Sequence, residues 1–323
     1  PRYGPSVLGG AETFVRDMAH YLPKDEFAVN VLTTCAEDLR SWRNVFSEGR
    51  SMIEGVPVYR FRIDHRMRNE QRYCELMIKF TNRWPTTVDE EYEWIANNAH
   101  SPALYDFIDR HADAYDYLIF VPYLFGITFY GMALHPKRSI LWPCLHDEPF
   151  AYFLETRLMM SSCRGIMFNC EPEKHLALDR LGVQNPGARI VGAGMRGMKG
   201  NPERFRSKYH LNEPFMVYSG RLASMKNLLQ LFEFFIRYKR EYPGPLKLVL
   251  LGKGDLRVPN HPDIVPLGFF RGQEKWDAYS AASILCQPSL LESFSIVIME
   301  SWLSGIPVLV HGDCDVTRYH VLE

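Results

Sequence analysis

Residues 288–305 read Pro-Ser-Leu-Leu-Glu-Ser-Phe-Ser-Ile-Val-Ile-Met-Glu-Ser-Trp-Leu-Ser-Gly. The short apolar segment before them, residues 283–287, predicts a buried strand that enters a turn at Pro288. Apolar residues at helical spacing begin near Ser295, and Gly305 is a typical helix stop. The order of strand, loop and helix predicts one unit of an α/β fold.

Two carboxylates mark this unit. Glu292 lies in the predicted loop, and Glu300 lies one to two turns inside the predicted helix. Backbone amides at a helix N-terminus are a natural seat for a phosphate or diphosphate, so the two carboxylates would flank such a group. The alternative is an ordinary helix with one capping and one surface Glu, because acidic residues are common near helix starts.

A second segment repeats the pattern with cations. Residues 215–220 predict an apolar strand that ends in Gly220, and a helix follows over 228–238. Arg221 stands at the strand end, and Lys226 stands just before the helix. Ligands of parallel sheets bind at the carboxyl ends of strands, so both cations could converge on one anion. A solvated loop with two unrelated charges is the alternative.

Strands alternate with helices along most of the chain, which predicts parallel sheets with right-handed crossovers. The glycine-rich stretch 192–200 predicts a linker, after which the alternation restarts. We therefore expect an N-terminal domain over 1–194 and a C-terminal domain over 195–323. Residues 60–100 interrupt the alternation and predict an irregular insertion. The other predicted helices are 11–22, 101–109 and 171–181, and the other predicted strands are 29–33, 56–63, 116–121 and 165–168.

The two charged segments together resemble the retaining glycosyltransferases of the GT-B class, family 4, also described as glycosyl transferases group 1. The resemblance rests on Gly220-Arg221-Leu222 with Lys226-Asn227, and on Glu292-Ser293-Phe294-Ser295 with Glu300, where Ser295 replaces the usual glycine. It extends along most of the chain. Further matching features are Gly9-Gly10-Ala11-Glu12, His146-Asp147 after an apolar run, and the strand and glycine turn over 248–254.

This resemblance implies an α/β fold of two Rossmann-like domains that face each other across a cleft. It implies a metal-independent, retaining hexosyltransferase that moves a sugar from a UDP- or GDP-sugar to a glycan or lipid-linked acceptor in polysaccharide biosynthesis, with no cofactor. Family members begin with a strand before the glycine loop and continue beyond residue 323. We therefore expect a chain that is truncated at both ends.

The resemblance also implies roles for individual residues. Arg221 and Lys226 would stabilise the leaving diphosphate, Glu292 would bind the transferred sugar, and Glu300 would accept bonds from the ribose hydroxyls. The remaining donor-binding residues would be Gly10, His146, Gly220, Phe294, Ser295 and Ile296.

Two other classes of function remain as alternatives. A sugar phosphorylase often needs a pyridoxal phosphate lysine, which the sequence does not identify, and a nucleotide-sugar epimerase needs acid/base carboxylates in place of the 292–295 segment. A non-catalytic binding protein with the same fold would be expected to lose Arg221, Lys226 or Glu300, and the chain has all three.

Composition excludes other classes. The chain has 323 residues with 37 basic and 38 acidic side chains, so its net charge of −1 argues against nucleic-acid binding. Its seven cysteines include no C-x-x-C pair, which favours a reducing compartment and predicts no zinc site. No apolar run reaches the ~18 residues of a membrane span, and no secretory signal is recognisable. These features predict a cytoplasmic protein.

The insertion carries a basic segment that includes Arg66 and Arg68. These arginines could hold an anionic acceptor or the anionic inner face of a membrane, as a peripheral contact. The alternative is a solvated surface on which this basic segment pairs with the acidic run Asp89-Glu90-Glu91.

Overall fold

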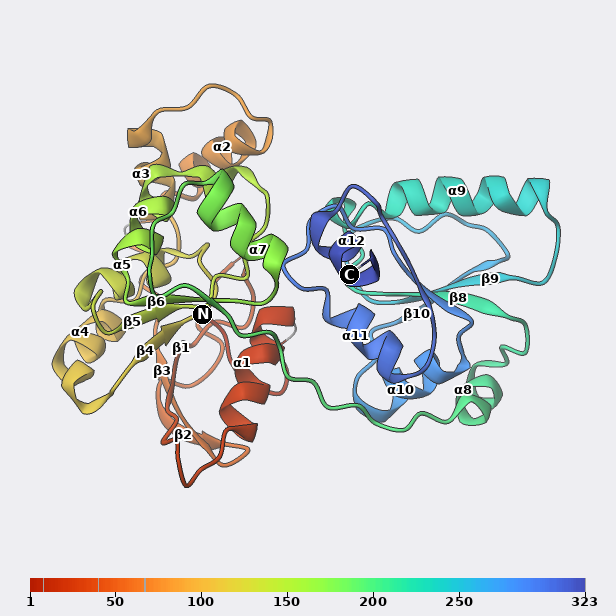
Figure 1. Cartoon of the computed structure of the whole chain (residues 1–323), viewed down its shortest axis with the longest axis horizontal. Coiled ribbons are helices and arrows are strands. Elements are labelled where there is room, and N and C mark those ends of the chain that lie inside the picture. Colours follow the sequence, from red (N-terminus) through yellow and green to blue (C-terminus); the bar gives the residue numbers. More distant parts are fainter. Residues whose placement is uncertain (8, 40, 67, 323) are drawn as a thin grey trace. The chain divides into compact units, whose positions relative to one another are not determined.

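The computed structural model describes residues 1–7, 9–39, 41–66 and 68–322. The chain divides into two compact units, Pro1–Ala193 and Gly194–Glu323. Each unit packs helices against sheets whose strands are mostly parallel (Figure 1). The α/β class expected from the sequence is therefore confirmed.

The second unit is built on one five-stranded parallel sheet with the order β10-β9-β8-β11-β12. Its strands are β8 (Phe215–Ser219), β9 (Lys247–Leu251), β10 (Ile264–Gly268), β11 (Ile284–Gln287) and β12 (Val308–Val310). Its helices are α8 (Pro202–Tyr209), α9 (Leu228–Glu241), α10 (Gly272–Ala281), α11 (Ile296–Leu303) and α12 (Asp315–Leu322).

Alternate residues of these strands pack on opposite faces of the sheet, because successive side chains of a strand point to opposite sides. Tyr218 and Leu250 join the core beneath α9, whereas Val217 and Val249 join the core that α8, α10 and α11 cover. Figure 1 shows α9 on one side of this sheet and α10 on the other. Both faces are covered, so these strands are continuously apolar, as the sequence indicated.

The strand order fixes where a ligand of the second unit would bind. The chain moves outward from β8 to β9 and β10, and then returns to place β11 and β12 on the other side of β8. The order reverses between β8 and β11, and open parallel sheets bind ligands at the carboxyl ends of the strands that border such a reversal. The loops 220–227 and 288–295 leave the sheet at this edge.

The first unit contains two sheets. One has the order β1-β3-β2 and the other, entirely parallel, has the order β4-β5-β6-β7. The strands are β1 (Val31–Thr34), β2 (Gly49–Ile53), β3 (Val56–Phe61), β4 (Leu118–Phe120), β5 (Ser139–Leu141), β6 (Gly165–Phe168) and β7 (Arg189–Ile190). The helices are α1 (Gly10–Tyr21), α2 (Glu70–Thr81), α3 (Val88–Ala96), α4 (Pro102–His111), α5 (Gly126–Leu134), α6 (Leu154–Ser162) and α7 (Glu171–His175).

A cavity of about 570 Å³ adjoins both sheets of the first unit. Val31 and Leu32 of β1, Leu118 and Ile119 of β4, and Val15 of α1 contribute to its wall. In the described part of the chain, β1 and β4 are each the last strand of their sheet, and each is paired on one side only.

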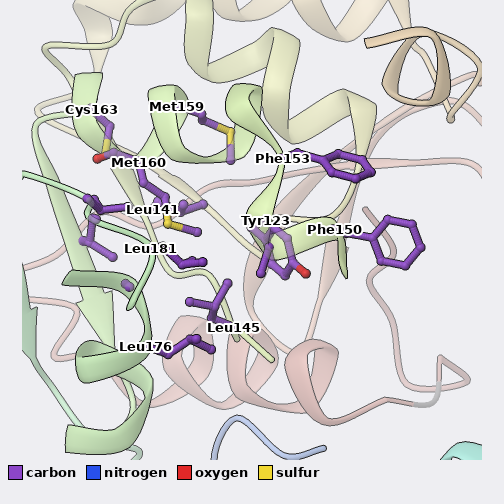
Figure 2. Close-up of a cluster of buried hydrophobic side chains, with 14 of the residues drawn as sticks. Tyr123, Leu141, Leu145, Phe150, Phe153, Met159, Met160, Cys163, Leu176 and Leu181 are labelled. Atoms are coloured by element: carbon purple, nitrogen blue, oxygen red, sulfur yellow. The ribbon is translucent and has the colours of Figure 1, made fainter. Parts of the chain in front are cut away.

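The main core of the first unit gathers apolar side chains from β5, α6 and the segment 171–181. Figure 2 shows this cluster, in which the side chains of Met160 and Leu141 lie between α6 and β5. Leu145, in the loop after β5, also belongs to it and is buried. The loop that carries His146 is therefore anchored in the core through the preceding residue.

Residues 60–100 are more regular than the sequence predicted. They include the end of β3 and then α2 and α3, and a capping box between Thr87 and Glu90 opens α3. Trp94 of α3 stacks on Phe150, with ring centroids 4.6 Å apart. The prediction of an irregular insertion is wrong for 70–96, because charged side chains on the outer faces of these helices obscure their short apolar faces. Within the described ranges, no helix is both long and apolar enough to cross a bilayer.

Candidate functional site

Two glycine-containing loops of the second unit interlock at the carboxyl ends of β8 and β9. The Gly220 amide donates to the Leu251 carbonyl (3.0 Å), and the Leu222 amide donates to the Lys253 carbonyl (3.0 Å). A Cβ atom at Gly252 would lie 1.8 Å from the Gly220 carbonyl oxygen, so only glycine allows this approach. Arg221 lies between the two bonded residues, and its side chain is exposed to solvent.

Lys226 and Glu292 form an ion pair between the loops that follow β8 and β11. The Lys226 Nζ and Glu292 Oε1 atoms are 2.7 Å apart, and the Glu292 side chain is only 9% exposed. Lys226 ends a 3-10 turn that precedes α9. The sequence predicted a cation in the first loop and a carboxylate in the second, and the structure brings these two side chains into contact.

Gln287, the last residue of β11, connects Glu292 to the start of α11. Its Nε2 atom lies 3.3 Å from Glu292 Oε1 and 3.1 Å from Ser295 Oγ. Ser295 itself has φ 62° and ψ 67°, a left-handed conformation. This conformation costs a non-glycine residue roughly 1–2 kcal/mol, which explains why the resembling family has glycine here.

Glu300, on α11, is buried, and both of its carboxylate oxygens contact side chains of α10. Lys275 Nζ lies 2.6 Å from Oε1 and 2.5 Å from Oε2, and the Tyr279 hydroxyl donates to Oε2 (2.9 Å). Burial, together with the charge of Glu300, raises the pKa of Tyr279 well above its usual range and keeps this donor protonated. Sequence reasoning missed Lys275 and Tyr279, because it predicted no helix over 272–281.

Phe294 and Ile296 flank Ser295 at the N-terminus of α11. The Phe294 ring packs edge-on against His320 of α12 (5.2 Å between centroids), and its carbonyl accepts from His320 Nε2 (2.7 Å). The Phe294 side chain therefore contributes to packing. The expected contribution of this segment to a ligand comes from backbone amides, because first-turn amides of a helix have no partner within the helix.

Gly10 and His146 belong to the first unit, whereas the other predicted donor-binding residues belong to the second. Gly10 is the first residue of α1, and the Glu12 carboxylate of the same turn pairs with Arg2 (2.5 Å). His146 follows β5, and its Nδ1 atom lies 3.5 Å from Glu148 Oε1.

A buried carboxylate that the sequence did not indicate holds the His146 loop. Glu173 Oε1 accepts from the Leu145 amide (2.6 Å), and Oε2 accepts from the Asn169 amide (2.5 Å). Burial raises the pKa of Glu173 to about 8, although these amide hydrogen bonds oppose the shift. The run Glu171-Pro172-Glu173 is typical of an exposed first turn of a helix, so no sequence signal marks Glu173 as buried.

The predicted basic segment is largely paired within the first unit. Arg66 Nη2 lies 2.6 Å from Asp64 Oδ2, and this contact lowers the pKa of Asp64 below its ordinary range. The Arg68 guanidinium lies over the Tyr73 ring (5.4 Å). Further pairs join α2 to α3, namely Arg72 with Glu93 and Lys79 with Glu90. Glu90 of the acidic run therefore pairs with α2, whereas Arg66 and Arg68 contact Asp64 and Tyr73 instead.

No group of three or more His, Cys, Asp or Glu side chains that could hold a metal ion occurs among the residues described. The sequence does contain an Asp-x-Asp segment at 313–315, after β12. Asp315 is the first residue of α12 and pairs with Arg318 (3.2 Å), and the Asp313 side chain is 88% exposed.

Comparison with known proteins finds a family model that is similar to the second unit. Residues 201–319 match the family model described as "Glycosyl transferases group 1". The match covers 119 residues, which is most of the second unit. A segment of 108 residues is also 29% identical to an uncharacterized glycosyltransferase of Methanocaldococcus jannaschii, covering 31% of this chain. The match spans 27% of the length of that relative.

Solved structures share the fold over nearly the whole chain. Anabaena HepE, in complex with UDP and glucose, is 14% identical with a TM-score of 0.63, covering 94% of this chain and 77% of that one. Sucrose-phosphate synthase from Thermosynechococcus elongatus is 14% identical with a TM-score of 0.65 (94% and 75%). WaaG, a glycosyltransferase involved in lipopolysaccharide biosynthesis, is 12% identical with a TM-score of 0.65 (99% and 81%). These likenesses establish the α/β fold of GT-B glycosyltransferases for this chain.

Proposed function

We propose that this protein is a hexosyltransferase that moves a sugar from a UDP- or GDP-sugar to a glycan or lipid-linked acceptor, with retention of anomeric configuration. One observation carries the proposal. The Lys226 ammonium and the Glu292 carboxylate meet, 2.7 Å apart, where the strand order reverses between β8 and β11. The family match of residues 201–319 and the UDP complex of Anabaena HepE support the same reading.

The cations of this edge would bind the leaving group. When the bond between the sugar and the phosphate breaks, negative charge develops on the diphosphate, and preorganised donors that stabilise such charge usually supply the largest catalytic contribution. Arg221 is exposed, and its two neighbours in the chain are held by hydrogen bonds. Lys226 follows five residues later in the same loop, and the first amides of α11 add backbone donors. Because these groups supply positive charge, we propose transfer without a metal ion.

The carboxylates would recognise hydroxyl groups on either side of the diphosphate. Glu292 adjoins Lys226 and would accept bonds from the transferred sugar, whereas Glu300, deeper in α11, would accept bonds from the ribose. For retention, the acceptor oxygen bonds to the anomeric carbon on the face from which the diphosphate leaves. The acceptor proton then passes to an oxygen of the departing phosphate, so no protein nucleophile is required.

The first unit would provide the acceptor side. His146 would contact the donor sugar, Gly10 would present amides of α1, and Arg66 and Arg68 would contact an anionic acceptor or the inner face of a membrane. For that last role, Arg66 would have to exchange Asp64 for the new partner. We place the activity in the cytoplasm, in polysaccharide biosynthesis.

A thermal-shift panel of UDP, GDP, ADP and their sugars tests the proposal first, since a ligand that binds only the folded state raises the unfolding temperature. We expect UDP or GDP to stabilise the chain more than ADP and Lys226→Ala to reduce this effect.

Transfer, followed as release of the nucleoside diphosphate, should persist in EDTA. No stabilisation by any nucleotide would contradict the proposal, as would activity that EDTA abolishes and magnesium or manganese restores. Binding of nucleotide sugars without any transfer would favour a non-catalytic binding protein.

A further inference from the structure

Lys275 is a partly buried cation to which the proposed chemistry assigns no role. It lies on α10, away from both charged loops in the sequence, and its side chain is 21% exposed. Its ammonium contacts both oxygens of Glu300, at 2.6 Å and 2.5 Å. A ligand group that reaches the Glu300 carboxylate must therefore also come next to this ammonium.

Tyr279 ties this pair to the edge of the sheet. Its hydroxyl donates to Glu300 Oε2 and is also hydrogen-bonded to the side chain of Ser219, the last residue of β8. Ser219 precedes Gly220, which opens the loop that carries Arg221. Because Tyr279 is completely buried, its position is fixed, and with it the position of the Glu300 carboxylate relative to β8.

The chemistry of the pair selects a particular ligand group. A carboxylate only accepts hydrogen bonds and an ammonium only donates them, whereas a hydroxyl does both. A hydroxyl placed between Lys275 and Glu300 can donate its proton to the carboxylate and accept a proton from the ammonium at the same time. A carbon without a hydroxyl can neither donate nor accept, so a deoxy analogue would lose both of these hydrogen bonds.

We propose that Lys275 is a specificity-determining residue of the donor site. It donates to a ribose hydroxyl that at the same time donates to Glu300, so that the site selects ribonucleoside diphosphates over their 2′-deoxy and 3′-deoxy analogues. This inference rests on the proposed function, because it assumes that Glu300 faces the ribose of the donor.

A second lysine ion pair, which joins α8 to α10, offers a matched control. Lys208 of α8 pairs with Glu274, the neighbour of Lys275 on α10. The Lys208 side chain is 60% exposed. The second partner of Glu274 is the Tyr209 hydroxyl, which is also on α8. Lys208→Met therefore removes the same type of charge from the same region without touching Glu300.

The experiment is a set of calorimetric titrations with the preferred nucleoside diphosphate, its 2′-deoxy analogue and its 3′-deoxy analogue. We expect the unaltered chain and Lys208→Met to bind at least one deoxy analogue at least tenfold more weakly than the ribonucleotide. Lys275→Met should reduce this ratio to about threefold or less, while the ribonucleotide itself binds more weakly.

The outcomes separate the inference from its premise. Equal weakening of all three ligands by Lys275→Met, or no discrimination by the unaltered chain, would overturn the role of Lys275 and leave the proposed function in place. Absence of binding of any nucleoside diphosphate to the unaltered chain would overturn both. Should Lys275→Met fail to fold because it leaves Glu300 unpaired, Lys275→Met combined with Glu300→Gln removes both charges. The same loss of discrimination is then expected, and retained discrimination contradicts the inference.

Discussion

Lys226 and Glu292 are separated by 66 positions in the sequence, and their side chains meet at 2.7 Å. Each stands in a loop that leaves the sheet at its carboxyl edge, one after β8 and one after β11. The contact therefore depends on the pairing of β8 with β11, which places Met216 opposite Ile284 and Val217 opposite Leu285. An ion pair at this position links the integrity of the sheet to the chemistry of the proposed site.

Lys226→Ala should affect both stability and turnover. Removing the ammonium leaves a largely buried carboxylate at Glu292, which should lower the free energy of unfolding by about 1–3 kcal/mol. Turnover should fall more than donor affinity, because the positive charge matters most as the diphosphate leaves. Urea denaturation and steady-state kinetics measure the two effects. Lys208→Ala, which removes a mostly exposed partner, is the control, and equal losses in both variants would argue against a special role for Lys226.

The two carboxylates should differ in the ligands that they affect. Glu300→Gln should weaken binding of a free nucleoside diphosphate at least tenfold, because charge-assisted hydrogen bonds to the ribose are worth roughly 1.5–3 kcal/mol each. Glu292→Gln should leave the free nucleotide unchanged and weaken only the sugar-bearing donor. Calorimetry with a nucleoside diphosphate and its sugar ester separates the effects. Our division of roles would be wrong if each variant weakened both ligands to the same degree.

Ser295 offers a test of backbone strain. Ser295→Gly relieves the left-handed conformation at the cost of the hydrogen bond to Gln287, so it should change the free energy of unfolding only slightly. Ser295→Ala keeps the strain and loses the bond, and should therefore be less stable than Ser295→Gly by about 1–2 kcal/mol. Thermal and urea unfolding of the two variants give the difference directly. Equal stability of the two would contradict the left-handed backbone at this residue.

Glu173 should make stability depend on pH. Its pKa is about 8 in the folded chain and near the ordinary 4.5 in the unfolded chain, so the folded state holds the proton more tightly. The free energy of unfolding should therefore fall as pH rises from about 4.5 to 8, by at most about 1.4 kcal/mol per unit. Glu173→Gln should flatten this part of the profile, as measured by urea denaturation between pH 5 and pH 9. An identical slope in both proteins would show that Glu173 does not titrate in this window.

Much of the fold was predictable because buried strands of a parallel sheet are apolar along their whole length. Strands were expected from this signal over 165–168 and 215–220, and the structure has β6 over Gly165–Phe168 and β8 over Phe215–Ser219. By contrast, α10 buries Trp276, Asp277, Ala278 and Tyr279 in succession, so its apolar residues show no helical spacing. β7 was missed because it is two residues long and exposed.

The candidate site also contains residues that the sequence could indicate and residues that it could not. Arg221, Lys226 and Glu292 lie in loops after recognisable strands, and Glu300 lies in the helix that follows one of these loops, so local sequence could indicate them. Their partners could not be foreseen, because contacts such as Lys275 with Glu300 depend on how two helices pack. Glu173 was missed for a related reason, since its burial arises from the approach of the loops that carry Leu145 and Asn169.

The cavity beside β1 and β4 has a consequence for backbone dynamics. Amide groups on the strand edges that border it lack a neighbouring strand in the described chain, whereas β8 has β9 on one side and β11 on the other. Local opening should need little free energy at such edges, and it should approach global unfolding in β8. In deuterated solvent, the amides of β1 and β4 that face the cavity should exchange within minutes, while those of β8 retain their protons longest.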